Sequence, residues 1–264
     1  MSDLKIPNRP SHDEPQPTGK EGVDFRLLPI DKTFAQTCLA FGLPYIAYVG
    51  LGSLLQGYIP IEIVSALKLG IVAALLWYFR KFYRWGPGLN LSQMGIAIGA
   101  SIVATAIWIL AVRFSLALPF WKGHLIASQT TVFSTSYWVL RAIASTLLVP
   151  LFEELFLRAY LGEFLFQVPE GAGSFTSRLG QRWDHFPEPL SGPPLSKLSV
   201  IGSTLCFTLG HDVASWAAAA LYFLFTYWVY AKTRSFRVCI VIHAITNLSI
   251  ALLVWARPEM HFLW

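Results

Sequence analysis

The sequence predicts an all-α protein: a polytopic bundle of transmembrane helices around a polar intramembrane cavity. Of its 264 residues, 55% are hydrophobic and only 13% are charged, whereas soluble domains carry about 25% charged residues. The charges gather between long apolar runs, as they do in proteins that cross a membrane several times. Ten Trp and ten Tyr residues suit the membrane–water interfaces, where an aromatic ring lies in lipid and its polar atom reaches the headgroups.

Seven apolar segments follow a polar tail. Residues 1–33 are rich in proline and charge and carry no apolar period, so we expect a disordered tail. The transmembrane domain is predicted over 34–256, and a short tail over 257–264 follows it. The predicted spans lie near 34–55, 62–79, 92–112, 137–166, 198–212, 214–231 and 238–256.

The fourth segment is longer than a membrane requires. Its 30 residues would make a helix of roughly 45 Å, against a hydrocarbon thickness of about 30 Å. Pro150 lies inside it and should kink or split the helix. A split would raise the count from seven spans to eight. The polar loop 167–197 that follows is predicted to be a solvated connector, with a lid or a partner site as alternatives.

Lysine and arginine choose the orientation of a membrane protein, because cytoplasmic loops carry an excess of them. Fourteen of the 20 fall in the tail or in alternate loops that would lie on the same side: Lys5, Arg9, Lys20, Arg26, Lys32, Arg80, Lys81, Arg84, Arg178, Arg182, Lys197, Lys232, Arg234 and Arg237. This bias accounts for the net charge of +5, and no basic stripe indicates a nucleic-acid partner. We expect a multi-pass protein with a cytoplasmic N-terminus. The size of the chain and the style of its motifs favour a bacterial inner membrane.

Ionisable residues inside a membrane cost at least a few kcal/mol each and therefore indicate function. Glu154 and Arg158 are spaced i, i+4, so they can neutralise one another on one face of a helix. Glu153 points about 100° away from Glu154 and cannot easily share that arginine. We therefore interpret Glu154 and Arg158 as structural and Glu153 as a reactive carboxylate. Lys68, in the second segment, has no obvious partner and receives no role.

Two further apolar segments carry polar residues at helical spacing. His211 follows Phe207 by one turn, and His243 lies on one face with Asn247. If the three segments face inward, an acid, two imidazoles and an amide surround one buried site. A carboxylate can take a proton from water, an imidazole can protonate a leaving amine, and donors can stabilise an oxyanion. Packing roles compete with this hypothesis, because buried polar side chains often join membrane helices and His211 can mark a helix end.

The depths of these residues present a difficulty for a single site. In the predicted topology His211 lies near the outer end of its span, whereas His243 is about six residues, or roughly 9 Å, from the inner side. A short or tilted fifth helix, or an additional span created at Pro150, would bring them level.

Together the three motifs resemble those of the CAAX-protease and bacteriocin-processing family of intramembrane proteases. Residues 153–158 (EELFLR) are similar to its EExxxR motif, 207–211 (FTLGH) to FxxxH and 243–247 (HAITN) to HxxxN. The order of the motifs agrees, and each lies in an apolar segment. The resemblance covers about residues 137–256.

The resemblance implies an intramembrane endopeptidase whose partners are the lipid bilayer and a membrane-associated peptide or protein substrate, with lipidated substrates included among the candidates. By that match Glu153 activates water, His211 assists, and His243 with Asn247 holds the oxyanion. Glu154, Arg158 and Phe207 support the site. We expect no cofactor. A zinc enzyme that uses Glu153, His211 and His243 is the first alternative, and a non-catalytic binding, immunity or transport protein is the second.

Overall fold

The computed structural model describes residues 34–55, 57–85, 88–118, 134–166 and 195–263, together with 174 and 176. The predicted tail over 1–33 and most of the loop 167–197 lie outside these residues. The described chain is helical and contains no strand. Its main helices are α1 (Phe34–Leu55), α2 (Ile61–Tyr78), α3 (Leu91–Ala117), α5 (Thr135–Ile143), α6 (Val149–Glu154), α7 (Glu163–Phe166), α9 (Lys197–Leu209), α10 (Trp216–Thr233) and α11 (Phe236–Ala256).

All seven predicted apolar segments are helical, but not all of them are long and apolar enough to span a membrane. By length and composition, five helices of the described chain can cross one: α1, α2, α3, α10 with the turn before it, and α11. The other two segments are α9, which has only 13 residues, and the composite helix that contains α5, α6 and α7. The structure therefore supports a multi-pass helical membrane protein, while the count of seven or eight spans stays a prediction.

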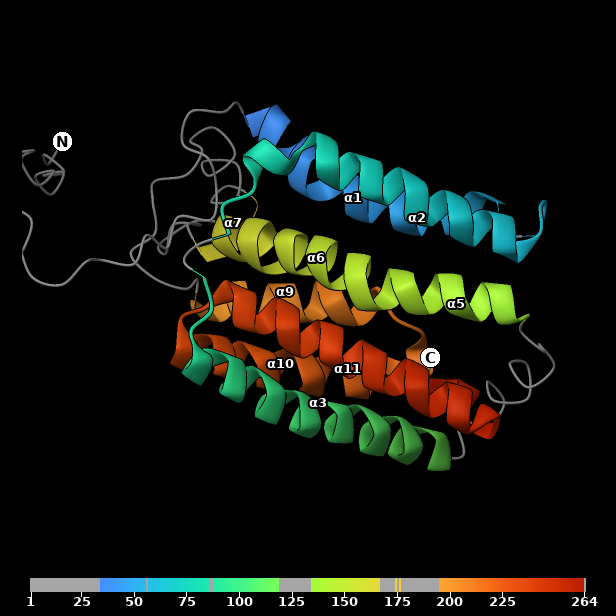
Figure 1. The fold of residues 1–264 in the computed structure, drawn as a ribbon. Coiled ribbons are helices and arrows are strands. Elements are labelled where there is room, and N and C mark those ends of the chain that lie inside the picture. Colours follow the sequence, from blue (N-terminus) through green and yellow to red (C-terminus); the bar gives the residue numbers. More distant parts are fainter. Residues whose placement is uncertain are drawn as a thin grey trace, which may run out of the picture.

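Pro150 changes the winding of the composite helix but does not split it. Two π-helical segments, Ala144–Leu148 and Leu155–Gly162, join α5, α6 and α7 into one helical run, which forms a continuous rod in Figure 1. The first segment ends where Val149 donates its N–H to the carbonyl of Ala144, five residues back. In the same register the carbonyl of Ser145 would need the N–H that proline lacks. The proline thus leaves one carbonyl available inside the bundle.

The helices form three layers. The α1–α2 pair lies on one side of the composite helix, and α3, α10 and α11 lie on the other, with α9 between the composite helix and α10 (Figure 1). Successive helices alternate in direction. The end of α2, the start of α9 and the end of α10 therefore meet at one end of the bundle, which carries Lys81, Arg84, Lys197, Lys232 and Arg237. We call this the basic end.

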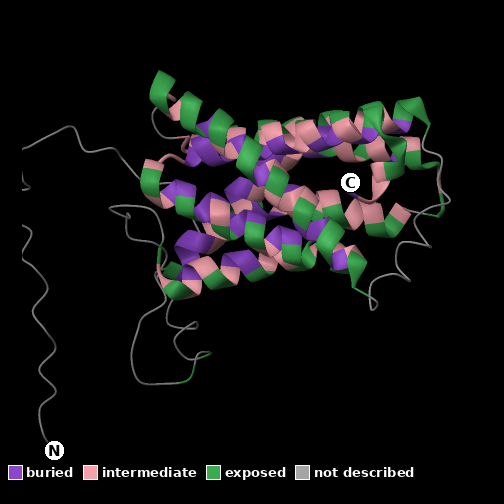
Figure 2. Cartoon of the chain, turned by 90° about the horizontal axis from the view of Figure 1, so that it is seen from below, coloured by how far each residue is buried: buried purple, intermediate pink, exposed green. Residues whose placement is uncertain are grey.

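Burial in this bundle follows the pattern of a protein surrounded by lipid. Large apolar side chains cover its outer faces, and Ile102, Leu110 and Trp228 are each more than half exposed. Figure 2 shows the buried residues on the inward faces and the exposed ones outward. Water would penalise so much exposed apolar surface, whereas hydrocarbon does not. This surface agrees with a membrane location.

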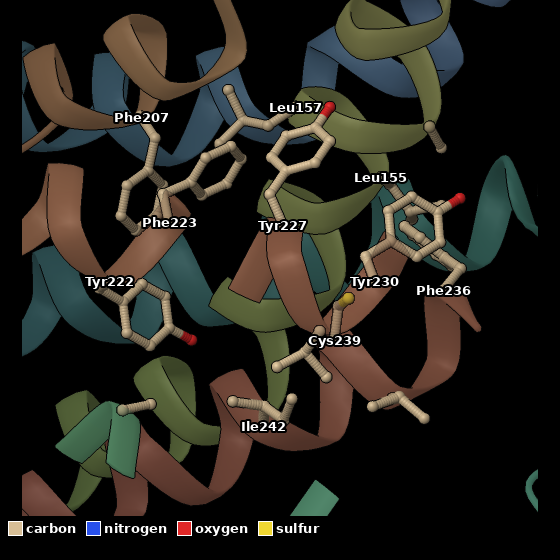
Figure 3. Close-up of a cluster of buried hydrophobic side chains, with 14 of the residues drawn as sticks. Leu155, Leu157, Phe207, Tyr222, Phe223, Tyr227, Tyr230, Phe236, Cys239 and Ile242 are labelled. Atoms are coloured by element: carbon tan, nitrogen blue, oxygen red, sulfur yellow. The ribbon is translucent and has the colours of Figure 1, made fainter. Parts of the chain in front are cut away.

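An aromatic cluster fills the centre of the bundle. Residues of α9, α10 and α11 meet the composite helix there, and Figure 3 shows Phe207, Phe223 and Tyr227 beside Leu157. The rings of Phe207 and Phe223 stack with centroids 4.7 Å apart. Because Phe207 lies two residues before the end of α9 and one turn before His211, this packing fixes the position of the helix end that precedes the histidine.

Gly162 allows the composite helix to approach α9 and α10 closely. A Cβ atom at Gly162 would lie 2.8 Å from the hydroxyl of Tyr227 and 3.2 Å from the carbonyl oxygen of Leu157. We expect Gly162→Ala to destabilise the purified protein by about 1–3 kcal/mol, the usual cost of overpacking. Gly99→Ala on the outer face of α3 is the control, because no atom lies within 4 Å of the added methyl group. Thermal unfolding in detergent measures both, and equal stability of the two variants would contradict this packing.

Candidate active site

One cavity of about 450 Å³ lies between the α1–α2 pair and the helices that carry the motifs. Side chains from both sides of the composite helix contribute to its wall. Glu153, His211, His243 and Asn247 all line it. The four residues selected from the sequence are therefore gathered around one space.

Because α9 is short, His211 and His243 can lie at similar depths in the bundle, although the predicted topology placed them apart. This helix starts at the basic end and stops at Leu209 after 13 residues, about 20 Å along its axis. His211 follows immediately and lies within the bundle, beside Trp108, with ring centroids 5.4 Å apart. Phe207 lies between the two histidines, at centroid distances of 4.5 Å from His211 and 6.1 Å from His243. The predicted end of the fifth span, at 212, was therefore close to correct, but the segment is shorter than a full span.

Arg158 is fully buried, and its partners are numerous. Its guanidinium forms an ion pair with Glu154 and donates a hydrogen bond to the hydroxyl of Thr226. The guanidinium also lies over the ring of Phe223, with its carbon 4.2 Å from the centroid. The i, i+4 pairing predicted from the sequence is present. Such a pair is stable inside a low-dielectric core only when further hydrogen bonds accompany it, and Thr226 supplies one.

The two adjacent glutamates have different surroundings. Glu154 is buried, pairs with Arg158 and does not line the cavity. Glu153 lines the cavity, and its side chain keeps 14% of its surface exposed. Its Oε2 atom has no hydrogen-bond partner among the described residues. This difference follows from the 100° that separates successive helical residues.

His243 lies between the two carboxylates. Its Nδ1 atom is 3.3 Å from Oε1 of Glu154, and its Nε2 atom is 3.7 Å from Oε2 of Glu153. A carboxylate paired with Arg158 can only accept, so Nδ1 carries the proton and Nε2 faces Glu153. The sequence had assigned Glu154 to Arg158 alone. The structure adds that Glu154 also orients the imidazole.

His211 has its tautomer fixed by the end of its own helix. Its Nδ1 atom lies 2.8 Å from the carbonyl oxygen of Phe207. Because a carbonyl only accepts, Nδ1 is the donor, and in a neutral ring Nε2 is left as an acceptor. His211 therefore marks the helix end, as the packing interpretation expected, and also lines the cavity.

Asn247 holds the composite helix against α11. Its Nδ2 atom donates a 2.7 Å hydrogen bond to the carbonyl of Ser145, the group that Pro150 leaves without a helical donor. The second hydrogen on Nδ2 remains for another acceptor. Sequence spacing placed Asn247 beside His243, but only the π-helical winding explains which backbone atom it contacts.

Several cavity residues carry no sequence motif. Tyr222 lines the cavity, and its buried hydroxyl has no hydrogen-bond partner in the described part of the chain. Lys68, Arg141 and Asp212 also line it. Lys68 had been noticed only as a cation within an apolar run. The segment Pro258–Leu263, expected to be a simple tail, turns back as a 3₁₀ helix and places Leu263 in the wall, where its carbonyl accepts a 3.1 Å hydrogen bond from Trp108.

The donor set does not fit a zinc ion well. Among the described residues no three His, Cys, Asp or Glu side chains are arranged to hold a metal. Nδ1 of His243 faces Glu154 and Nδ1 of His211 is bonded to a backbone carbonyl, so Nε2 of each ring is the atom left for a metal. Glu153, His211 and His243 are not arranged as a ligand group for zinc in the described chain.

Fold and site together define a class: a multi-pass helical membrane protein with a carboxylate, two imidazoles and an amide around one internal cavity. Residues 134–249 match the model of a protein family described as type II CAAX prenyl endopeptidase Rce1-like. The matched segment contains all three motifs, so it confirms the resemblance drawn from them and supports a protease. Comparisons with curated proteins and with solved structures gave no match.

Proposed function

We propose that this protein is an intramembrane endopeptidase that hydrolyses a peptide bond near the membrane surface with water activated by Glu153. The substrate is a membrane-associated peptide or protein, and the family match favours one with a lipidated cysteine near its end. The lipid bilayer is the second partner. No cofactor takes part in the proposed mechanism.

The chemistry begins with a water molecule between Glu153 and the scissile carbonyl. Glu153 takes a proton from the water as the oxygen attacks the carbonyl carbon, and the carbonyl oxygen becomes an oxyanion. A proton on Nε2 of His243, in addition to the one on Nδ1, and the free hydrogen of the Asn247 amide stabilise that charge in this mechanism. The carbon–nitrogen bond then breaks, and the leaving amine receives the proton, with His211 assisting the transfer.

The observation that carries this proposal is the Oε2 atom of Glu153, which accepts no hydrogen bond from the described residues and has only the imidazole of His243 nearby, at 3.7 Å. Its neighbour Glu154 is committed to Arg158 and His243, whereas Glu153 faces the cavity without a hydrogen bond from any described residue. A buried carboxylate without a donor is costly, so the arrangement is better suited to a water-binding base than to a structural acid.

His211→Gln tests the proton-transfer step. Glutamine keeps a donor and acceptor of similar length but cannot carry a proton between water and an amine. We expect kcat for a lipidated peptide to fall by about a hundredfold, the scale of acid–base catalysis, while KM changes little. His261→Gln is the matched control, because His261 bonds only the nearby Pro258 carbonyl among the described residues and does not line the cavity. Unchanged kcat in His211→Gln would remove this residue from the mechanism.

The metal question has its own test. We expect cleavage to persist after treatment with a chelator, and we expect metal analysis of the active protein to find less than one zinc ion per chain. The physical reason is the lack of a preorganised ligand group in the described chain. Stoichiometric zinc together with chelator-sensitive cleavage would establish the zinc mechanism instead.

A further inference from the structure

A lysine projects into the cavity from the α1–α2 pair. Lys68 of α2 lines the cavity, and its Nζ atom lies 3.8 Å from the ring centroid of Tyr48. Gly52, one turn further along α1, leaves space for it, because a Cβ atom there would lie 3.3 Å from Nζ. No ion pair found among the described residues includes Lys68. The ammonium group is thus held in place by an aromatic face and a glycine rather than by a carboxylate.

A second cation faces the same space from the composite helix. Arg141 lines the cavity, and its Nη1 atom donates a 2.7 Å hydrogen bond to the hydroxyl of Tyr137. Lys68 and Arg141 thus line the same cavity from two different helices. Two like charges brought together inside an apolar bundle raise its energy unless an anion joins them.

Among the described residues, the acids near the cavity do not supply an anionic partner for Lys68. Glu153 lines the same cavity and is approached by His243. Asp212 lines the cavity beside His211, from the turn after α9. Glu62, at the start of α2, accepts a 2.6 Å hydrogen bond from Ser134 and does not line the cavity. The wall that contains Lys68 therefore presents an ammonium group to whatever enters, and Arg141 adds a second cationic side chain to the lining.

We propose that Lys68 and Arg141 form a subsite for the free carboxylate at the C-terminal end of the peptide substrate. This inference rests on the proposed function, because it supposes that a peptide enters the cavity to reach Glu153. A cavity of about 450 Å³ is of the size that accepts a drug-sized ligand. It can hold a short stretch of peptide, so a chain that ends close to the bond that is cut would fit inside it.

The positive charge of Lys68 and Arg141, and their position along the bundle relative to Glu153, agree with a subsite for a terminal carboxylate. Lys68 is seven residues from the start of α2 and Arg141 is six from the start of α5, and both helices start at the end of the bundle opposite the basic end (Figure 1). Glu153 is 12 residues further along the composite helix than Arg141. Along the axis of the bundle, Lys68 and Arg141 therefore lie between Glu153 and the end opposite the basic end. A peptide that places its scissile bond at Glu153 can extend its last residues toward them.

The test uses two peptides that differ only at the end. Each carries an S-farnesyl cysteine three residues before its C-terminus and a fluorophore–quencher pair, and one ends in a free acid while the other ends in an amide. We expect the wild type in neutral detergent to cleave the acid with a kcat/KM at least about tenfold higher than the amide, the scale of a hydrogen bond to a charged group. Lys68→Met should remove most of this preference, and Lys68→Arg should retain it.

Lys81→Met is the matched control, because Lys81 is exposed beyond the end of α2 and lies outside the cavity lining. It should keep the full preference for the acid. Equal cleavage of both peptides by the wild type, or an unchanged preference in a folded Lys68→Met protein, would overturn the subsite. A preference that appears only after anionic lipid is added would assign the cations to lipid phosphate and would also overturn it. Cleavage of neither peptide, with Glu153 intact, would instead count against the proposed function.

Discussion

Replacement of Glu153 by glutamine is expected to lower peptide turnover at least about a hundredfold and to leave the fold intact. Glutamine has the same shape but cannot take a proton from water, so the loss falls on acid–base catalysis. The neutral amide also removes a buried carboxylate that has no hydrogen-bond donor among the described residues. Stability should therefore stay level or rise. Cleavage of the farnesylated peptide and thermal unfolding, measured on the same preparation, check both parts.

Glu259→Gln serves as the control for this experiment. Glu259 is well exposed, and within the described part of the chain it pairs only with Arg257 at the surface, so its loss should change neither property. Wild-type turnover in Glu153→Gln would contradict the mechanism and would favour the non-catalytic alternative. A collapse of stability would show that Glu153 is a structural acid.

Arg158→Ala should have the largest effect on stability. The substitution leaves Glu154 as a buried charge without its cation and removes the hydrogen bond to Thr226. Breaking a buried pair in this way costs about 3–5 kcal/mol, which is comparable with the whole stability of many domains. We expect poor yield of folded protein from membranes and a much lower midpoint of thermal unfolding.

A double substitution separates the ion pair from simple packing. Glu154→Gln together with Arg158→Met leaves no unpaired charge and keeps similar volumes. It should therefore be more stable than Arg158→Ala, because exchanging a buried pair for neutral groups is often tolerated. Its activity should still be low, since His243 would lose the carboxylate that orients it. A double variant that is as unstable as Arg158→Ala would indicate that the volume of the guanidinium, and not its charge, is what the core requires.

Much of this arrangement was predictable from the sequence, because a long apolar run marks the position of each membrane helix. Apolar runs gave all seven helical segments, and helical spacing gave the pairs Glu154–Arg158 and His243–Asn247. The 100° between neighbours separated the two glutamates correctly into one paired acid and one that faces the cavity. These are properties of a single helix, so they need no knowledge of how helices pack.

The remaining contacts depend on packing between helices, which spacing does not contain. No pattern indicated that His243 would lie between both glutamates, or that Asn247 would find the Ser145 carbonyl freed by Pro150. Lys68 gave a signal, a cation in an apolar run, but its contact with Tyr48 depends on the pairing of α1 with α2. The return of Pro258–Leu263 to the cavity wall had no signal at all, since those residues look like an ordinary tail.

The central claim is that Glu153, His211, His243 and Asn247 surround one cavity inside the membrane. Electron cryomicroscopy of the protein in a lipid nanodisc measures this directly. We expect Oε2 of Glu153 to lie close to the 3.7 Å from Nε2 of His243 that the structure gives, and His211 and Asn247 to face the same space at the depth of the hydrocarbon. A map in which His211 or Glu153 points into lipid, or in which the histidines lie at different depths with packed side chains between them, would contradict the account.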